Sequence, residues 1–264
     1  MPHAHVNGIK MYYEIHGQGQ PIILLQGFTR NTLNWRHMAE SLQKKYQVIL
    51  LDNRGSGRTQ HPSPPYSMAM MAKDVAELLK TLGIKTGFFV GHSMGGAILQ
   101  QLCIDYPELV KKAVICSSFA QLPYPCIMQM DAVSEMALAG VAPEFIFQTV
   151  LPGLFSSQCL SIEGNPEKII QSMLHDPYLQ KPEGYIGQVE ALKAFNSTDN
   201  LSDIECPCLI VVGENDLCTP LSCSILLQTK IKMAQLKVIP QQGHMINEEV
   251  PDQLCQEIQA FLDS

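Results

Sequence analysis

Long apolar runs are absent from this sequence of 264 residues. No stretch approaches the roughly 20 apolar residues that a membrane-spanning helix needs, and no basic flank followed by an apolar segment marks a secretory signal. Basic residues are few, since 18 Lys and Arg stand against 25 Asp and Glu for a formal net charge of −7, and they form no run. Such a chain is poorly suited to a polyanionic partner. We therefore expect a cytoplasmic protein without a membrane span and without a nucleic-acid partner.

A metal-binding or disulfide pattern is missing as well. The nine cysteines are odd in number and lie scattered through apolar runs, as Cys103, Cys116 and Cys255 do. This distribution is typical of reduced thiols that pack as small core residues. Cys206 and Cys208 are separated by a single residue, a spacing that does not match zinc ligand patterns. We expect neither a metal nor an organic cofactor.

The most informative segment that is present spans residues 91–96 and reads Gly-His-Ser-Met-Gly-Gly. An apolar, strand-like run leads into it, and a helical pattern of small residues follows it. A serine at such a tight strand-to-helix turn exposes its Oγ, and the flanking glycines supply the clearance. Ser93 is therefore the candidate nucleophile. The main-chain N–H of Met94, in the first helical turn, would point at an oxyanion formed beside it.

A serine nucleophile requires a base and a carboxylate that orients the base. Both are present just beyond the C-terminal ends of later predicted strands, where α/β sheets place their functional groups. Asp216 follows the apolar run 209–212, and His244 follows the run 236–239. Glu214 and Asp203 compete with Asp216 for the role of the acid, and Glu214 is the second choice.

With two further segments, this order of residues resembles the α/β-hydrolase family, whose members carry nucleophile, acid and histidine in the same sequence order. Residues 26–29 (Gln-Gly-Phe-Thr) follow a predicted strand where relatives have His-Gly-x, and residues 52–59 resemble their Asp-x-Arg-Gly-x-Gly-x-Ser loop. The resemblance implies that the amide of Phe28 is the second oxyanion donor. Gln26 replaces the usual histidine, but a main-chain donor does not depend on the side chain that precedes it.

Alternating strand and helix patterns predict an α/β fold with a mostly parallel sheet flanked by helices, and the resemblance implies the α/β-hydrolase fold. The Asn7-Gly8 pair between two β-prone runs predicts an N-terminal hairpin. Residues 121–195 interrupt the alternation with helical pieces and no convincing strand. We expect residues 1–120 and 196–264 to form the core and residues 121–195 to form a helical cap over Ser93.

Several apolar residues are candidates for substrate contact. Met and Phe side chains of the expected cap could line an apolar cavity, and no cluster of Arg or Lys occurs among them to bind a charged group. Packing in the core is an equal alternative for Trp35. The expected substrate contacts are Gly27, Trp35, Met128, Phe145 and Met245, and further cap residues that could line the cavity are Met130, Met136, Phe147, Phe155 and Met173.

These observations predict a cofactor-independent serine hydrolase that cleaves a small, largely apolar ester, lactone or thioester through a Ser93 acyl-enzyme. The motifs most resemble those of small esterases, enol-lactonases and cofactor-free haloperoxidases. The protein would bind a small-molecule substrate and act as a monomer or homodimer. Carbon–carbon bond hydrolysis and perhydrolysis on the same triad remain alternatives, as does a non-catalytic ligand receptor.

Overall fold

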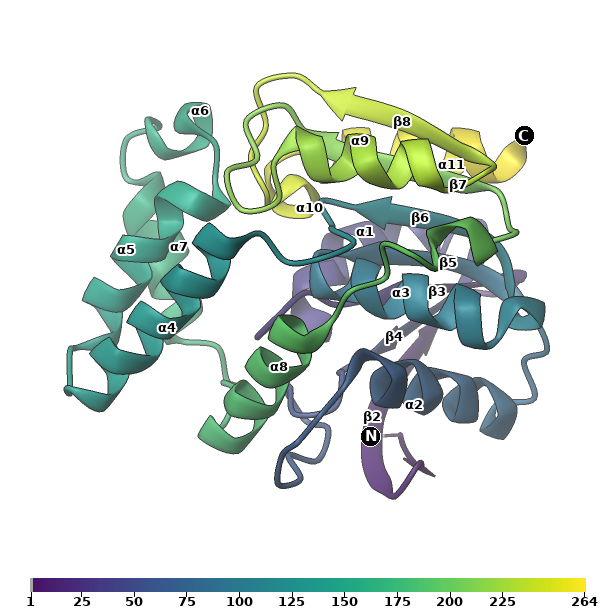
Figure 1. The fold of residues 1–264 in the computed structure, drawn as a ribbon, viewed down its shortest axis with the longest axis horizontal. Coiled ribbons are helices and arrows are strands. Elements are labelled where there is room, and N and C mark those ends of the chain that lie inside the picture. Colours follow the sequence, from purple (N-terminus) through teal and green to yellow (C-terminus); the bar gives the residue numbers. More distant parts are fainter. Residues whose placement is uncertain (1) are drawn as a thin grey trace.

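The computed structural model describes residues 2–264 and contains an eight-stranded sheet with helices on both faces (Figure 1). The strand order is β1-β2-β4-β3-β5-β6-β7-β8. Only the contacts of β2 with β1 and with β4 are antiparallel among these strands, so the predicted, mostly parallel α/β sheet is confirmed. The strands are β1 (His3–Val6), β2 (Ile9–His16), β3 (Gln20–Leu25), β4 (Tyr46–Leu51), β5 (Gly87–His92), β6 (Val110–Cys116), β7 (Cys208–Gly213) and β8 (Ala234–Ile239).

The predicted N-terminal hairpin is present and joins β1 to β2. Asn7 and Gly8 have φ angles of 43° and 78°. A two-residue turn that matches the twist of its strands needs positive φ at both central positions, which Asn-Gly provides at little cost. Val6 and Ile9 are therefore placed opposite each other.

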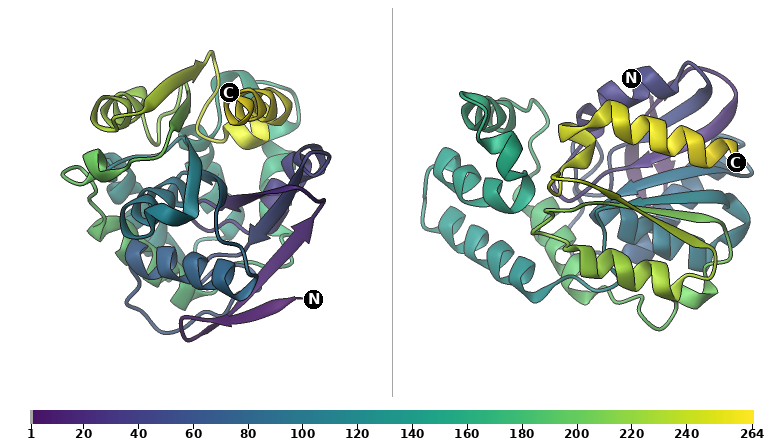
Figure 2. Two further views of the ribbon diagram at one scale, coloured as in Figure 1. Left: turned by 90° about the vertical axis from the view of Figure 1, so that its right-hand side faces the viewer. Right: turned by 90° about the horizontal axis from the view of Figure 1, so that it is seen from above.

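The hydrophobic core lies on both faces of the sheet because side chains alternate along each buried strand. In β3, Ile22 and Leu24 join the cluster on one face, and Ile23 and Leu25 join the cluster on the other. One face is covered by α1 and α11 and the opposite face by α2, α3 and α9 (Figure 2). These helices are α1 (Arg36–Leu42), α2 (Met68–Thr81), α3 (Met94–Asp105), α9 (Leu221–Lys230) and α11 (Pro251–Asp263).

Residues 121–195 between β6 and β7, called the helical insertion below, stand beyond the C-terminal ends of the parallel strands (Figure 1). Gln121 and Asn196 form an isolated antiparallel bridge, so the two ends of the insertion lie together. No helix within residues 2–264 is long and apolar enough to cross a bilayer. The insertion contains α4 (Tyr124–Leu138), α5 (Pro143–Leu154), α6 (Ser157–Leu160), α7 (Asn165–Leu174) and α8 (Pro182–Ala194), and a short α10 (Ile246–Glu249) precedes α11.

Candidate active site

Ser93 occupies the tight turn between β5 and α3. Its φ of 53° and ψ of −118° lie outside the favourable regions for a residue with a side chain, so the surroundings must hold the turn. The Ser93 N–H donates to the carbonyl of Cys116 at 2.9 Å, and the Ser93 carbonyl accepts from Ser118 Oγ at 2.9 Å. A Cβ atom on Gly95 would lie 2.2 Å from the carbonyl oxygen of Leu25. Glycine at this position therefore lets α3 pack closely against the end of β3.

The structure brings together the three predicted residues Ser93, His244 and Asp216. His244 Nε2 lies 3.0 Å from Ser93 Oγ, and His244 Nδ1 lies 2.9 Å from Asp216 Oδ2. Glu214 is exposed and accepts the main-chain N–H of Gln241 at 3.0 Å. Asp203 is also exposed. Of the three acids considered from the sequence, Asp216 is therefore the one that contacts the imidazole.

Asp216 is held as a carboxylate by a set of buried donors. Its Oδ1 accepts the amides of Cys218 at 2.9 Å and Thr219 at 2.8 Å, and its Oδ2 accepts the hydroxyl of Thr219 at 2.9 Å. Burial acts to raise the pKa of this carboxyl, but the facing His244 and the Thr219 donors outweigh it and place the pKa below its ordinary value. The sequence indicates only that Asp216 can accept the main-chain N–H two residues on, as it does from Cys218, and does not reveal the contact with Thr219.

His92 supports the loop that carries His244. Its Nε2 lies 2.9 Å from the carbonyl oxygen of His244, so this nitrogen must carry the hydrogen. Burial, reinforced by the neighbouring His244, lowers the pKa of His92 to about 3. The ring is therefore neutral near pH 7 and acts as a fixed donor. The sequence placed His92 in the turn but gave no sign of this contact.

The predicted oxyanion donors belong to two segments near the nucleophile, the start of α3 and the loop after β3. Met94 is the first residue of α3, where main-chain N–H groups lack an intrahelical acceptor. Gly27 and Phe28 line the same cavity as Ser93, and a Cβ on Gly27 would lie 3.5 Å from Ser93 Cβ. Within residues 2–264 the Phe28 amide has no hydrogen-bond acceptor. The Phe28 amide is therefore available to a ligand beside Ser93, and the Met94 amide stays a predicted donor by its position next to Ser93.

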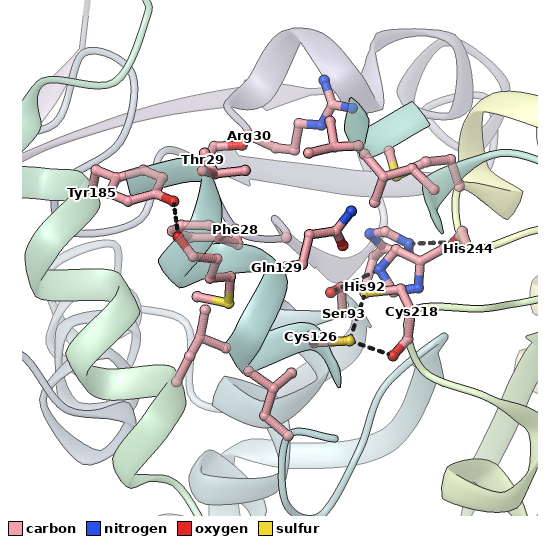
Figure 3. Close-up of a pocket in the computed structure, with 18 of the residues that line it drawn as sticks. Phe28, Thr29, Arg30, His92, Ser93, Cys126, Gln129, Tyr185, Cys218 and His244 are labelled. Carbon is pink, nitrogen blue, oxygen red and sulfur yellow. Dashed lines mark hydrogen bonds between the residues drawn. The ribbon is translucent and has the colours of Figure 1, made fainter. Parts of the chain in front are cut away.

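A largely apolar cavity lies over Ser93, between the core and the helical insertion (Figure 3). Its polar side chains besides the Ser93 and His244 pair include Arg30 and Gln129, which stand among apolar neighbours. The described part of the chain has no group of His, Cys, Asp and Glu side chains arranged to hold a metal ion. The lining residues of the core are Gly27, Phe28, Thr29, Arg30, His92, Ser93, Phe119, Cys218, His244 and Met245, and those of the insertion are Leu122, Cys126, Gln129, Met130, Val133, Ile146, Phe147, Val150, Leu154, Met173, Tyr185 and Leu192.

Gly27 and Met245, two of the five expected substrate contacts, line this cavity, and the other three do not. Trp35 is fully buried in the core cluster beneath α1 and α11. Met128 and Phe145 are 59% and 62% exposed on α4 and α5. Each helical residue turns by about 100°, so a neighbour one position away faces the cavity instead. The composition of these helices can be read from the sequence, but the face that each helix turns to the cavity cannot.

The comparisons with known proteins agree with this arrangement. The family described as alpha/beta hydrolase fold matches residues 20–251. RutD of Azorhizobium caulinodans, named as a carbamate hydrolase, is 30% identical over 254 residues, which cover 96% of this chain and 94% of that protein.

Solved structures are similar over the full length. An esterase from Thermogutta terrifontis superposes with a TM-score of 0.87 at 27% identity, covering 100% of this chain and 98% of that one. The enol-lactonase from Burkholderia xenovorans LB400 also gives a TM-score of 0.87, at 24% identity and with complete coverage of both chains, which shows the same fold. Because the family match spans most of the chain, this protein belongs to the α/β-hydrolase fold family of enzymes, as its motifs predicted.

Proposed function

We propose that this protein is a serine hydrolase that cleaves a small, largely apolar ester, lactone or thioester through an acyl-enzyme on Ser93. The observation that carries the proposal is the continuous series of hydrogen bonds from Ser93 through His244 to Asp216 beneath an apolar cavity. A serine becomes a nucleophile when a base stands within hydrogen-bond distance and a carboxylate orients that base.

The reaction follows from the positions of the atoms. His244 Nε2 takes the proton of Ser93 Oγ as the oxygen attacks the substrate carbonyl, and it returns this proton to the leaving oxygen or sulfur. Asp216 fixes the tautomer of the imidazole and stabilises its charged form. Water, activated by the same histidine, then hydrolyses the acyl-enzyme.

The amides of Phe28 and Met94 would bind the oxyanion of the tetrahedral intermediate. Each fixed donor of this kind contributes about 3 kcal/mol to transition-state stabilisation. Because both donors belong to the main chain, the replacement of the usual histidine by Gln26 leaves them in place.

We assign residues 1–120 and 196–264 to the catalytic core and residues 121–195 to a cap that selects the substrate. The insertion contributes mainly apolar side chains to the cavity, which favours a small-molecule substrate with an apolar acyl or alcohol part. Removal of apolar substrate surface from water would supply the binding energy.

Labelling by a fluorophosphonate probe tests the nucleophile. The wild type should be labelled, and Ser93→Ala should not, because the substituted side chain has no oxygen to phosphonylate. Hydrolysis of short p-nitrophenyl esters by Ser93→Ala should fall by about 10⁵- to 10⁶-fold. Equal labelling of both proteins would contradict the assignment, and an absence of ester hydrolysis by the wild type would favour a ligand receptor.

Substitution of the acid gives an independent test. Asp216→Asn keeps the shape of the side chain but favours the wrong histidine tautomer, so kcat should fall by about 10⁴-fold while the melting temperature stays close to that of the wild type. Glu214→Gln is the matched control and should retain activity, because Glu214 is exposed and contacts a loop amide. A larger fall in kcat for Glu214→Gln than for Asp216→Asn would show that Glu214, and not Asp216, is the acid that orients His244.

Carbamate hydrolysis is a second candidate, favoured by the 30% identity to RutD over nearly the whole chain. A carbamate carbonyl would be attacked by the same serine, and Gln129 in the cavity offers an amide that can pair with the carbamate nitrogen. A matched pair of substrates, an ester and a carbamate of the same alcohol, separates the candidates. A higher kcat/KM for the carbamate would favour this second function.

A further inference from the structure

Two thiols from distant parts of the chain meet in the wall of the cavity. Cys126, in the first turn of α4, and Cys218, two residues after Asp216, have sulfur atoms 3.6 Å apart. Cys126 Sγ also donates to the carbonyl oxygen of Cys218 at 2.7 Å. Both residues line the cavity that holds Ser93, and Figure 3 shows them beside Ser93 and His244. The catalytic steps proposed above use neither thiol.

The two thiols are close enough to be oxidised one after the other. The contact with Cys218 and the nearby His244 act to lower the pKa of the Cys126 thiol, whereas burial and Asp216 act to raise it. The same contact and burial raise the pKa of Cys218. Thiolates react with peroxides far faster than thiols do, so whichever thiol of the pair loses its proton attacks first, and the other sulfur, 3.6 Å away, is placed to close the disulfide.

We propose that Cys126 and Cys218 form an oxidisable dithiol, which a peroxide converts to a disulfide between the helical insertion and the loop that carries Asp216. One thiol of the pair gives up its proton and attacks one peroxide oxygen as a thiolate, the O–O bond breaks, a sulfenic acid forms, and the leaving hydroxide takes up the released proton to give one water. The other thiol then attacks this sulfur, the S–O bond breaks, and its proton leaves with the hydroxide as a second water. Overall, two thiols lose two electrons and two protons, and one peroxide is reduced to two waters.

This disulfide would act directly on the candidate active site. The sulfur atoms must approach from 3.6 Å to a bond length of about 2.05 Å, which shifts Cys218 and the start of α4 towards each other. The Cys218 amide donates to Asp216 Oδ1, so this shift disturbs the carboxylate that orients His244. The bond also fixes one end of the insertion to the core. Oxidised protein should therefore turn over substrate more slowly, a consequence that rests on the proposed function.

A second cluster of thiols in the same chain can also react with the peroxide. Cys206 Sγ lies 3.8 Å from Cys103 Sγ and 3.9 Å from Cys208 Sγ, and none of the three lines the cavity with Ser93. Oxidation at that cluster would consume thiols without touching the candidate active site. Cys206→Ser removes the thiol common to both of its contacts and is the control background.

The experiment treats the full chain with hydrogen peroxide, blocks the remaining thiols and maps linked peptides by mass spectrometry. We expect a Cys126–Cys218 crosslink in the wild type and in Cys206→Ser, a fall in kcat/KM for p-nitrophenyl butyrate of about 10-fold or more, and recovery with dithiothreitol. Cys126→Ser and Cys218→Ser, each compared with its own untreated sample, should keep their rates through the same treatment.

The outcomes separate the two parts of the proposal. Loss of thiols without a Cys126–Cys218 crosslink would show that these two residues are not an oxidisable pair. A crosslink that leaves the rate unchanged would show that the disulfide does not control turnover. A loss of rate that persists in Cys126→Ser would show the same. If the reduced protein hydrolyses no ester, the function proposed above fails, and the peptide map still decides whether the disulfide forms.

Discussion

His92 is a neutral imidazole held in a fully buried position beneath the His244 loop. Its pKa of about 3 in the folded protein lies well below the ordinary value of 6.5. Between these two pH values the unfolded chain binds a proton at this side chain and the folded protein does not. The free energy of unfolding must therefore fall as the pH decreases from 6.5 to about 3. The contribution of His92 to this free energy is complete above pH 6.5.

Replacement of His92 should reduce this pH dependence. We expect the free energy of unfolding of His92→Asn to change less steeply than that of the wild type, by about 1.4 kcal/mol per pH unit between pH 6 and pH 4. Urea unfolding at several pH values measures the slopes. His5→Asn is the control because His5 is exposed. Equal slopes for His92→Asn and the wild type would show that folding does not lower the pKa of His92.

The strand–turn–helix unit of β5, Ser93 and α3 depends on close approach of main chains. A Cβ on Gly95 would meet the main-chain oxygen of Leu25 at 2.2 Å, and an oxygen in a buried strand cannot move as a flexible side chain does. The helix must therefore shift away from the sheet to admit any larger residue. Such a shift would move both Ser93 and the Met94 amide.

Gly95→Ala should consequently destabilise the protein by about 3 kcal/mol and reduce ester hydrolysis. Gly153→Ala is the matched control, because the new Cβ would lie 3.5 Å from Gln129 in ordinary contact and alanine favours the helix α5 by up to about 1 kcal/mol. Thermal and urea unfolding compare the two. Equal stability of Gly95→Ala and the wild type would show that the contact between α3 and β3 has room to adjust.

The cavity exists only where the helical insertion meets the core. The insertion is anchored around it by Arg58, whose guanidinium lies 3.6 Å from the ring centroid of Tyr12 and 4.2 Å from that of Tyr178. Asn31 also donates to Asp176 at 2.7 Å. These contacts join the loop before α8 to the core and hold the walls of the cavity together.

Two phenylalanines of α5 test whether the insertion selects the substrate. Phe147 lines the cavity, whereas Phe145 is exposed. Phe147→Ala should raise the ratio of kcat/KM for octanoyl over butyryl esters by about 10-fold, because the lost ring leaves space for extra methylenes. Phe145→Ala should leave this ratio unchanged. Similar ratios in both variants would show that this helix does not select the substrate.

The sequence by itself determined the strands, most of the helices and the turn at Ser93. These features depend on local chemistry: Asn-Gly favours the positive φ angles of the hairpin, and alternating apolar residues favour buried strands. The positions of Ser93, Asp216 and His244 after three separate strands could be read for the same reason, since the C-terminal ends of parallel strands share one edge of a sheet.

Only the tertiary structure decided which side chains meet. Trp35 packs in the core, Met128 and Phe145 face outward, and Cys126 reaches Cys218 across 92 residues of chain. The direction of each helical face in the insertion depends on how the helix docks, and docking is set by many weak contacts that no short segment encodes. Local patterns therefore predicted the candidate triad, whereas the cavity wall and its pair of thiols emerged only when distant segments packed together.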